Sequence, residues 1–433
     1  MCLFTSLRAF RRRKISFVFF TIIFWIFLRN GFFLSHYWNN DNLITGSKVR
    51  LVTGTEWNLS TGNLSAVNVK HNALRVSHGR EVDLPTAYTE HTNNENSSKF
   101  SRNHIVIGVF ANKNRGKWEN KYICPGSGIY VQTIQNDDFS LLNETDAVYF
   151  PGGSLTFIEW DKLPALRSPN QVWIFNSFES PVHTQPLDSH VARHGFNWTF
   201  TYRSDSTFPS PYGRYNPGEP LISDTDTTDW AVNKTHFAAW IGSNCHNTQW
   251  PRQDFVRKLK KFIPLDTFGS CGTKKCPKNP KCGEILRKYK FYLALENSHC
   301  TDYITEKFWR APFKNNMIPV VYGPSKEDYQ KVAPPKSFIH VDDFETIEGL
   351  ATYLKLLDRN NTLFNEYFEW KRKGSVQMDL IGQYYISRKV MCPIAGRIKA
   401  RRDAGNRTAD IIDMQKWWTN SCRERSIRAM LKS

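Results

Sequence analysis

Short, continuously apolar runs alternate with amphipathic stretches through most of the chain after His104. A run without polar alternation, such as His104–Phe110, is typical of a strand that is buried on both faces of a parallel sheet. Loops that contain Pro and Gly separate these runs. The sequence therefore predicts a first set of strands at His104–Phe110, Ala147–Phe150, Val172–Phe175 and Phe196–Tyr202.

A second set of alternating elements begins at His236. The order strand, helix, strand over residues 291–322 is that of a βαβ unit. Two consecutive α/β halves predict two facing Rossmann-like domains with a ligand-binding cleft between them. The predicted strands are His236–Ile241, Leu265–Phe268, Phe291–Leu295, Met317–Tyr322 and Phe338–Val341, and the predicted helices are Asp254–Phe262, Asp302–Ala311, Ile347–Leu357 and Thr362–Lys373.

The N-terminus has the layout of a membrane signal, because a basic cluster ending at Lys14 precedes an apolar run. The run extends from Ile15 to Leu28, Arg29 can snorkel, and residues 32–34 continue the apolar stretch towards Tyr37 and Trp38, which suit the far membrane interface. The basic cluster would keep the N-terminus in the cytosol, which makes the protein type II. A cleaved secretory signal is the alternative, but no small-x-small cleavage site follows the run. We predict a cytosolic tail at 1–14, an uncleaved transmembrane anchor at 15–34 and everything after it in the lumen.

The rest of the chain divides by composition. The region up to about Phe100 is rich in Asn, Ser, Thr and His and has no sustained apolar period, which is typical of a stem. The predicted segments are a lumenal stem at 35–102, a first Rossmann-like domain at 103–229, a second at 230–385 and a C-terminal tail at 386–433.

A lumenal location predicts glycans and disulfides. Without Cys2, which falls in the cytosolic tail, the number of cysteines is even, which favours disulfides over a metal site because the C-x2-C spacing of structural zinc is absent. The remaining cysteines are Cys124, Cys245, Cys271, Cys276, Cys282, Cys300, Cys392 and Cys422. The glycosylation sequons are at Asn58, Asn63, Asn96, Asn143, Asn197, Asn233, Asn360 and Asn406.

The formal net charge is +18, which by itself would suit nucleic acid, a membrane surface or an anionic substrate. No zinc-finger spacing, RNP-like motif or basic zipper accompanies this charge, and the Lys and Arg residues are scattered along the chain. We therefore predict that the protein does not bind nucleic acid.

The stretch from Lys290 to Trp309 has the densest polar pattern, because its polar residues follow a buried strand and open the predicted helix 302–311. Ligands bind at this position in open α/β sheets. Asp302 or Thr301 would cap the helix, and Tyr303, Glu306, Lys307 and Arg310 would share one face at spacings of three and four. Lys307 suits the diphosphate of a nucleotide sugar. Spacing alone also allows Glu306 and Lys307 to be ordinary solvated helix residues.

The motifs in this stretch resemble the donor-binding signature of the α1,3-fucosyltransferases (glycosyltransferase family 10), in an invertebrate-like form. The matching motifs are Leu293-Ala-Leu-Glu-Asn-Ser298, Asp302-Tyr-Ile-Thr-Glu-Lys-Phe-Trp309, Ile318-Pro-Val-Val-Tyr-Gly323, Val172-Trp-Ile-Phe-Asn-Ser-Phe-Glu-Ser-Pro181, the segment Phe196–Ser206 with Pro211-Tyr-Gly213, and Gly242-Ser-Asn-Cys245 followed by Arg252. They occur in the order of the family and extend the resemblance over most of the chain after Asn103.

The resemblance implies the fold, the reaction and the roles of the site residues. The fold would be GT-B, with 103–229 on the acceptor side, 230–385 binding GDP-fucose and the tail packing on the catalytic region. Such an enzyme is a type II Golgi membrane protein that transfers L-fucose, with inversion, to the 3-hydroxyl of N-acetylglucosamine in a glycoprotein glycan. The implied roles are Glu179 as general base, Arg252 and Lys307 on the diphosphate, Tyr303 and Glu306 on the nucleoside or fucose, and Asn297 and Ser298 lining the donor pocket.

The resemblance implies no bound metal and no tightly bound cofactor, with Mn²⁺ or Mg²⁺ stimulating activity. Many relatives have a C-terminal Cys-x-x-Cys, whereas Cys392-Pro-Ile-Ala395 keeps only the first cysteine, which suggests a pairing of Cys392 with Cys422. Asp224-Thr-Asp226 fits the manganese-binding motif of another glycosyltransferase fold, but it lies in a polar loop and we interpret it as a linker. A membrane-tethered lectin without turnover is the other function considered. The identity of the acceptor glycan and a homodimer stay open.

Overall fold

The structure of the chain is a computed structural model. The structure describes residues 48–51, 56–58, 73–76, 81–83, 102–111, 120–152, 167–184, 187, 189–277, 280–378, 387–405, 410–423 and 427. The predicted cytosolic tail and membrane anchor, and the sequons at Asn63, Asn96 and Asn406, lie outside these residues. Within them, none of the helices has the length and apolar character needed to cross a membrane.

Residues 1–91 form one compact unit and residues 92–433 another. The first unit contains a small antiparallel sheet with the strand order β2-β1-β3-β4, in which Val49 pairs with Val76 and Leu51 with Leu74. The predicted stem therefore contains regular structure, which its polar composition did not indicate because each strand is only three or four residues long. The strands are β1 (Lys48–Leu51), β2 (Glu56–Asn58), β3 (Ala73–Val76) and β4 (Glu81–Asp83).

The second unit begins with a sheet that is parallel except for its edge strand β6, which pairs antiparallel with β7. Strands β8 and β9 are buried along their whole length, as their continuous apolar sequences predict. We refer to residues 102–217 as the first half. In spatial order its strands are β11 (Phe208–Pro209), β10 (Trp198–Thr201), β9 (Val172–Ser177), β8 (Ala147–Phe150), β5 (His104–Phe110), β7 (Tyr130–Asn136) and β6 (Lys121–Ile123).

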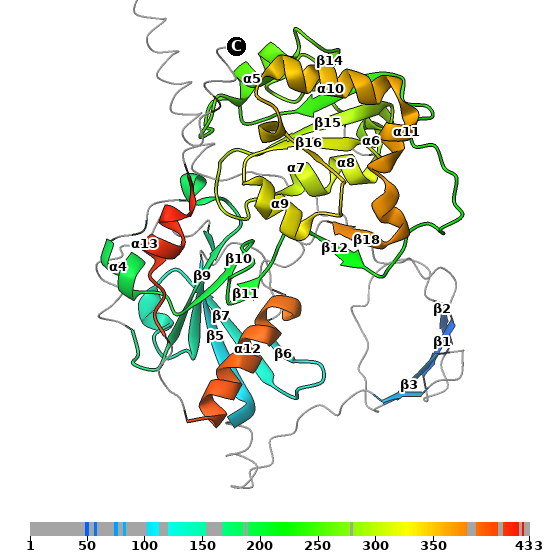
Figure 1. The fold of residues 1–433 in the computed structure, drawn as a ribbon. Coiled ribbons are helices and arrows are strands. Elements are labelled where there is room, and N and C mark those ends of the chain that lie inside the picture. The colour runs from blue at the N-terminus through cyan, green and yellow to red at the C-terminus, as the bar shows by residue number, and fades with distance from the viewer. Residues whose placement is uncertain are drawn as a thin grey trace, which may run out of the picture. The chain divides into compact units, whose positions relative to one another are not determined.

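A second parallel sheet follows, flanked by amphipathic helices (Figure 1). We refer to residues 230–378 as the second half. Its strands in spatial order are β14 (Leu265–Phe268), β13 (His236–Ile241), β15 (Tyr289–Leu295), β16 (Ile318–Tyr322) and β17 (Ile339–His340). Its helices are α5 (Arg252–Leu259), α6 (Lys281–Leu286), α7 (Glu306–Trp309), α8 (Ala311–Lys314), α9 (Lys326–Val332), α10 (Ile347–Arg359) and α11 (Asn361–Glu366). The predicted α/β fold class is confirmed.

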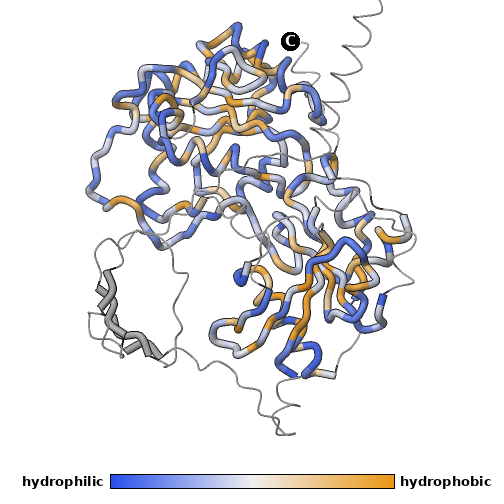
Figure 2. The backbone as a smooth tube through the Cα atoms, turned by 180° about the vertical axis from the view of Figure 1, so that it is seen from behind, coloured by the Kyte–Doolittle hydropathy of each residue, from blue (hydrophilic) through white to orange (hydrophobic). Residues whose placement is uncertain are grey.

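The chain crosses between the halves twice. β12 (Gly213–Pro217), which ends the first half, pairs antiparallel with β18 (Gly374–Met378), which follows the helices of the second. The chain then returns to the first half, where helix α12 (Arg388–Asp403) packs its buried face against β5 and β7 (Figure 1). Figure 2 shows the hydrophobic residues concentrated along the strands of both sheets. The apolar core of the first half therefore includes the C-terminal part of the chain.

The halves touch closely where Gly213 meets Trp309. A Cβ atom on Gly213 would lie 2.3 Å from the indole ring of the fully buried Trp309, so only glycine fits there.

The prediction of disulfides is confirmed, because the eight cysteines in the described part of the chain form four of them. The suggested pairing of Cys392 with Cys422 is wrong: helix α12 places Cys392 against the first sheet, beside Cys124, whereas Cys422 lies next to the segment after β15. The bonds are Cys124–Cys392, Cys245–Cys271, Cys276–Cys282 and Cys300–Cys422.

Among the described sequons, Asn197 is a poor glycan acceptor. Its side chain is buried, and its Oδ1 accepts a 2.9 Å hydrogen bond from the backbone N–H of Trp173 and a second bond from Arg167. Asn233, in contrast, is exposed and has a positive φ of 64° in a surface turn. We expect a glycan on Asn233 and none on Asn197. Peptide mapping by mass spectrometry after enzymatic deglycosylation would check this, and a glycan found on Asn197 would contradict it.

Candidate active site

The second sheet has its topological switch point between β13 and β15, because the chain moves from β13 to β14 on one side and then to β15 on the other. Ligands bind at the carboxyl ends of the strands that flank such a point. Arg252, at the start of α5, lies there and is buried. One of its terminal nitrogens donates 2.8 Å bonds to the Leu295 carbonyl and to Oδ1 of Asn297, and the other donates a 2.7 Å bond to the Asn244 carbonyl. Arg252 therefore connects the segment that follows β13 with the end of β15.

The other predicted donor residues after β15 lie beside this guanidinium. Asn297 is half-buried and shares its amide oxygen with Arg252. Ser298 is fully buried, and its hydroxyl has no hydrogen-bond partner among the described residues. Nε of Arg252 likewise has none there. Burial lowers the pKa of Arg252, while the charge of Glu296 opposes that change. The structure thus brings Arg252 and Asn297 into contact, with Ser298 next to Asn297 in the chain.

A buried carboxylate, Glu296, is central to this region and was not predicted from the sequence. It is 0% exposed and accepts hydrogen bonds from the backbone N–H of Thr305 at 2.8 Å and from its hydroxyl at 2.9 Å. Its other oxygen lies 3.1 Å from Nζ of Lys307. Burial raises the pKa of Glu296, and the charge of Lys307 opposes the rise. Its position directly after a buried strand, within Leu293-Ala-Leu-Glu-Asn-Ser298, was the feature that could have indicated it.

Lys307 is held by three oxygens. Its ammonium group contacts Glu296, the hydroxyl of Thr305 at 2.9 Å and the exposed carboxylate of Glu306 at 3.4 Å. Burial disfavours the charged ammonium, but the carboxylates of Glu296 and Glu306 outweigh this effect and raise the pKa of Lys307. The side chain therefore stays cationic and remains partly exposed, at 21%. A cation held in this way can stabilise an anionic group that binds beside it.

The predicted helix 302–311 is wrong at its start. The helix begins at Glu306 and its N-cap is Thr305, whose hydroxyl accepts from the Lys307 N–H, so neither Asp302 nor Thr301 is the cap. Asp302 instead has a left-handed φ of 60°, and its carboxylate accepts 3.0 and 2.7 Å bonds from the backbone N–H and hydroxyl of Ser204 in the first half. That contact between halves competes with capping. Tyr303 therefore lies outside the helix.

Tyr303 reaches the predicted general base. Its hydroxyl donates a 2.8 Å hydrogen bond to Oε2 of Glu179, and its ring is buried with its centroid 5.1 Å from that of Tyr202. Glu179 follows β9 at the carboxyl edge of the first sheet and is exposed. Burial raises the pKa of Tyr303, and so does the charge of Glu179, which keeps the phenol protonated and able to donate. The bond joins the two halves at the site.

His183 is a further group that the sequence reasoning missed. It ends the short 3-10 helix η3 (Pro181–His183), directly after Glu179 and Ser180. Its Nε2 is shielded from solvent and has no hydrogen-bond partner among the described residues. Burial lowers the pKa of His183, the charge of Glu179 raises it, and those of Lys307 and Arg252 lower it. The charges that act on the imidazole therefore come from both halves. The position of His183, four residues after Glu179, was the sequence feature that could have indicated it.

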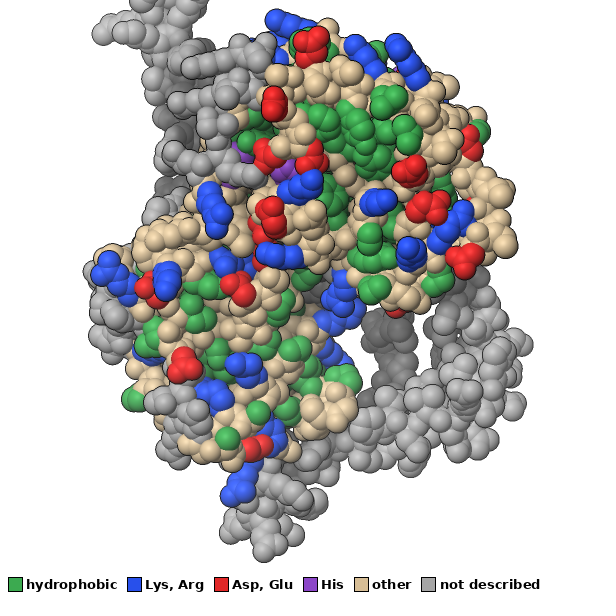
Figure 3. Space-filling view, in the orientation of Figure 1, with side chains coloured by type: hydrophobic (Ala, Val, Ile, Leu, Met, Phe, Trp, Pro, Cys, Tyr) green, Lys and Arg blue, Asp and Glu red, His purple; other side chains and the backbone are tan. Residues whose placement is uncertain are grey.

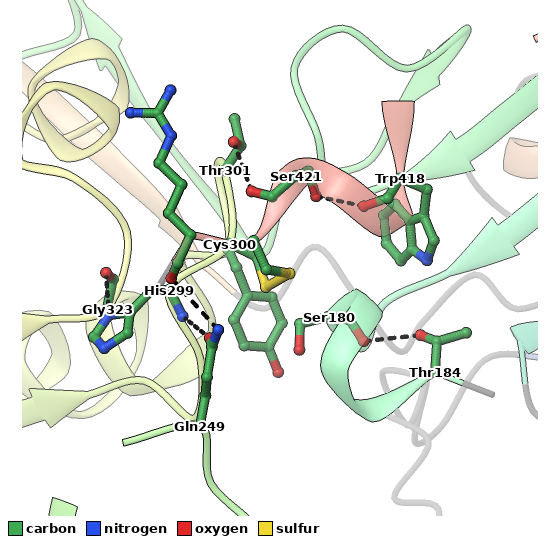
Figure 4. Close-up of a disulfide and its surroundings, with 12 residues drawn as sticks. Ser180, Thr184, Gln249, His299, Cys300, Thr301, Gly323, Trp418 and Ser421 are labelled. Atoms are coloured by element: carbon green, nitrogen blue, oxygen red, sulfur yellow. Dashed lines mark hydrogen bonds between the residues drawn. A yellow bond between two sulfur atoms is a disulfide. The ribbon is translucent and has the colours of Figure 1, made fainter. Parts of the chain in front are cut away.

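The loop preceding Tyr303 is fixed by a disulfide. Figure 4 shows Cys300, which is bonded to Cys422 and belongs to the His299–Thr301 segment of the second half, close to Ser180 of the first half. Thr301 also donates to the carbonyl of Ser421 through its backbone and its hydroxyl. The C-terminal segment with α13 (Met414–Trp417) thus supports the site from one side.

A pocket of about 400 Å³ borders the site on the side of Asp302 and Ile304. Both halves line it, mostly with apolar and aromatic side chains. It does not include Arg252 or Lys307. Its lining residues from the first half include Tyr202 and Tyr215, and those from the second include Trp309 and Lys331.

Asp224 is exposed and Asp226 is half-buried. Both belong to the loop before β13, where Arg372 donates to the backbone carbonyls of Asp224 and Asp226. The described residues contain no cluster of three or more His, Cys, Asp or Glu side chains in reach of one metal ion. Figure 3 shows Lys and Arg interspersed with Asp and Glu over the visible face, rather than in one basic patch.

Comparison with solved structures finds a crystal structure of an α1,3-fucosyltransferase with GDP-fucose. The match has 18% sequence identity, a TM-score of 0.43, and covers 68% of this chain and 90% of that chain. A structure of the same description with GDP matches with a TM-score of 0.42 and 18% identity, over 69% and 90% of the two chains.

Comparison with sequences finds fucosyltransferases. Glycoprotein 3-α-L-fucosyltransferase A of Drosophila melanogaster is 38% identical over 272 residues, 61% of this chain and 51% of that protein. Human α-(1,3)-fucosyltransferase 4 is 33% identical over 68% of this chain and 52% of its own length. The chain thus spans about half the length of these two relatives. α-(1,3)-Fucosyltransferase C of Drosophila melanogaster is 34% identical over 326 residues, 70% of this chain and 72% of that protein.

The family comparison covers both halves of the chain. The N-terminal fucosyltransferase domain matches residues 101–213, and the C-terminal domain of glycosyltransferase family 10 (fucosyltransferase) matches residues 231–417. The first match covers the strands of the first sheet, and the second match covers the strands of the second sheet. Residues 214–230 lie between the two matches. The chain belongs to glycosyltransferase family 10, the fucosyltransferases.

Proposed function

We propose that the chain is a GDP-fucose-dependent α1,3-fucosyltransferase of the GT-B fold, which transfers L-fucose with inversion to the 3-hydroxyl of an N-acetylglucosamine in a glycoprotein glycan. The observation that carries the proposal is the contact between Glu179 and Tyr303. This contact brings a carboxylate of the first half to the segment of the second half that also carries Lys307. A general base and a cation that can bind phosphate are therefore held by the same segment.

The reaction is a single displacement. Glu179 accepts the proton of the acceptor hydroxyl, whose oxygen forms a bond to the anomeric carbon of fucose while the bond from that carbon to the diphosphate oxygen breaks. The electron pair of the broken bond leaves on GDP. Lys307 and Arg252 stabilise the charge that develops on the diphosphate, which is where fixed cations lower a barrier most. Ser298 and Nε of Arg252 supply polar groups that no described side chain satisfies.

The acceptor and the cellular setting are part of the same proposal. The acceptor is an N-glycan core or a terminal lactosamine or its N-acetylgalactosamine analogue. The disulfides and sequons support a lumenal catalytic region, and we propose a type II Golgi membrane protein. Mn²⁺ or Mg²⁺ is expected to stimulate the reaction without being required. Sedimentation analysis of the purified chain would measure whether it forms a homodimer.

A transfer assay tests the function. Full-length protein in detergent is incubated with radiolabelled GDP-fucose and three acceptors: an N-glycan core, lactosamine and its N-acetylgalactosamine analogue. We expect fucose on the 3-hydroxyl of N-acetylglucosamine in one of them, and no transfer from GDP-mannose. Glycan binding without any transfer, together with failure to bind GDP, would favour the lectin instead.

Replacing Lys307 by alanine should lower the turnover number by about 100-fold or more, because a preorganised cation is lost from the leaving diphosphate. The turnover numbers of both proteins at saturating acceptor give the comparison. A Lys399→Ala variant is the matched control, since Lys399 pairs with Asp403 on helix α12, which packs against β5 and β7 of the first sheet. A Lys307→Ala enzyme as fast as the wild type would exclude the role proposed for Lys307.

A further inference from the structure

The hydrogen bond from Tyr303 to Glu179 has a direction and a geometry that bear on the base. The phenol donates to Oε2 of the carboxylate at 2.8 Å. A carboxylate has two oxygens, and a donor fixed on one of them limits rotation about the last side-chain bond. Oε1 is then the oxygen that can face an acceptor hydroxyl. The exposed position of Glu179 would otherwise leave its side chain free to choose among rotamers.

Tyr303 itself is held on several sides. The preceding Asp302 is bonded to Ser204, and Cys300 is tied to Cys422. Two residues further on, Thr305 donates two hydrogen bonds to the buried Glu296. The ring is 1% exposed and packs against Tyr202. The hydroxyl therefore points at Glu179 from a segment whose position is set from both halves of the protein.

We propose that Tyr303 is a positioning residue for the general base: its hydroxyl orients the Glu179 carboxylate toward the acceptor. This inference rests on the proposed fucosyltransferase function. Tyr303 and Lys307 are four positions apart on one anchored segment. The residue that orients the base is thus attached to the residue that meets the diphosphate, and the base is oriented only when the second half is docked on the first.

Two tyrosines that pack on each other provide a matched pair of variants. Tyr303→Phe removes the hydroxyl that bonds Glu179, whereas Tyr202→Phe removes a buried hydroxyl that has no hydrogen-bond partner among the described residues. Both changes keep the ring and its packing. We expect Tyr303→Phe to lower kcat by about 10- to 100-fold, the range for a lost hydrogen bond to a charged group. The KM for GDP-fucose and the Kd for GDP should stay within about twofold, and Tyr202→Phe should resemble the wild type.

A double-mutant cycle in the full-length protein separates positioning from packing. In a Glu179→Gln background, Tyr303→Phe should change the residual kcat by less than about twofold, because its effect passes through the carboxylate that is already lost. GDP binding, measured by calorimetry, verifies that each variant is folded.

Three results would overturn the assignment. A Tyr303→Phe protein with unchanged kcat and a raised Kd for GDP would make Tyr303 a donor contact. Equal losses in Tyr303→Phe and Tyr202→Phe, or additive losses with Glu179→Gln, would make it a packing residue. If the wild type transfers fucose and any of these is seen, only the role of Tyr303 fails; if the wild type transfers none, the proposed function fails and this inference with it.

Discussion

Replacing Glu179 by glutamine should lower the rate of fucosyl transfer by about 10²- to 10⁴-fold, the contribution that a positioned general base usually makes. The amide cannot accept the proton of the acceptor hydroxyl, yet it keeps the size of the side chain and an oxygen for the Tyr303 hydroxyl. Donor binding should be unaffected, because Arg252 and Lys307 lie in the other half and do not bond Glu179.

The rate is measured with radiolabelled GDP-fucose at saturating acceptor, and GDP binding by calorimetry. Glu219→Gln serves as the matched control, since Glu219 is an exposed carboxylate in the loop after β12 that bonds Asn216 and Ser375. A Glu179→Gln enzyme that retains most of its activity would show that another group takes the proton.

Replacing Glu296 by alanine should have the largest effect on stability. The change removes the acceptor of the Thr305 hydrogen bonds and the buried partner of Lys307. Removing one member of a buried ion pair typically costs about 3–5 kcal/mol. We expect the lower end of that range, because Lys307 keeps Glu306 as a partner and is partly exposed to water. Transfer should also fall, since Lys307 loses the contact that directs it.

Thermal unfolding followed by tryptophan fluorescence would measure this effect, and a fall of the midpoint by roughly 5–10 °C corresponds to it. Glu296→Gln should fall between the alanine variant and the wild type, because it still accepts from Thr305 but carries no charge. Glu284→Ala, at an exposed position of α6, should change the free energy of unfolding by less than about 0.5 kcal/mol. Equal midpoints for Glu296→Ala and the wild type would refute the structural role of this carboxylate.

The sequence indicated those parts of the fold that depend on local pattern. Strands such as β8 are buried from end to end, and their uninterrupted apolar residues reflect that burial directly. The start of α7 could not be predicted in the same way, because Asp302 is a good capping residue whose carboxylate is taken by Ser204, a residue 98 positions away. At that position the contact between Asp302 and Ser204 outweighs the preference of Asp302 for capping a helix.

The same distinction applies to the site. Arg252 and Lys307 were predicted because each lies in or soon after a motif that carries the family resemblance. The structure places both at the carboxyl edge of the second sheet, where the strand order reverses. Glu296 and His183 were missed because the significance of each lies in what it faces: the first in Thr305 and Lys307, the second in charges from both halves. The partner of Cys392 was misassigned because the return of α12 to the first sheet has no local sequence pattern.

That return of the chain has a consequence for biosynthesis. Translation delivers the first half before the second, but the first apolar core stays incomplete until Val390, Met391 and Ile394 of α12 have been made. The Cys124–Cys392 bond, which spans 268 residues, can close only after nearly the whole chain has been synthesised. A nascent chain must therefore keep an open hydrophobic surface while the second half forms, and a premature stop before residue 388 would leave two lobes of which only one can bury its core.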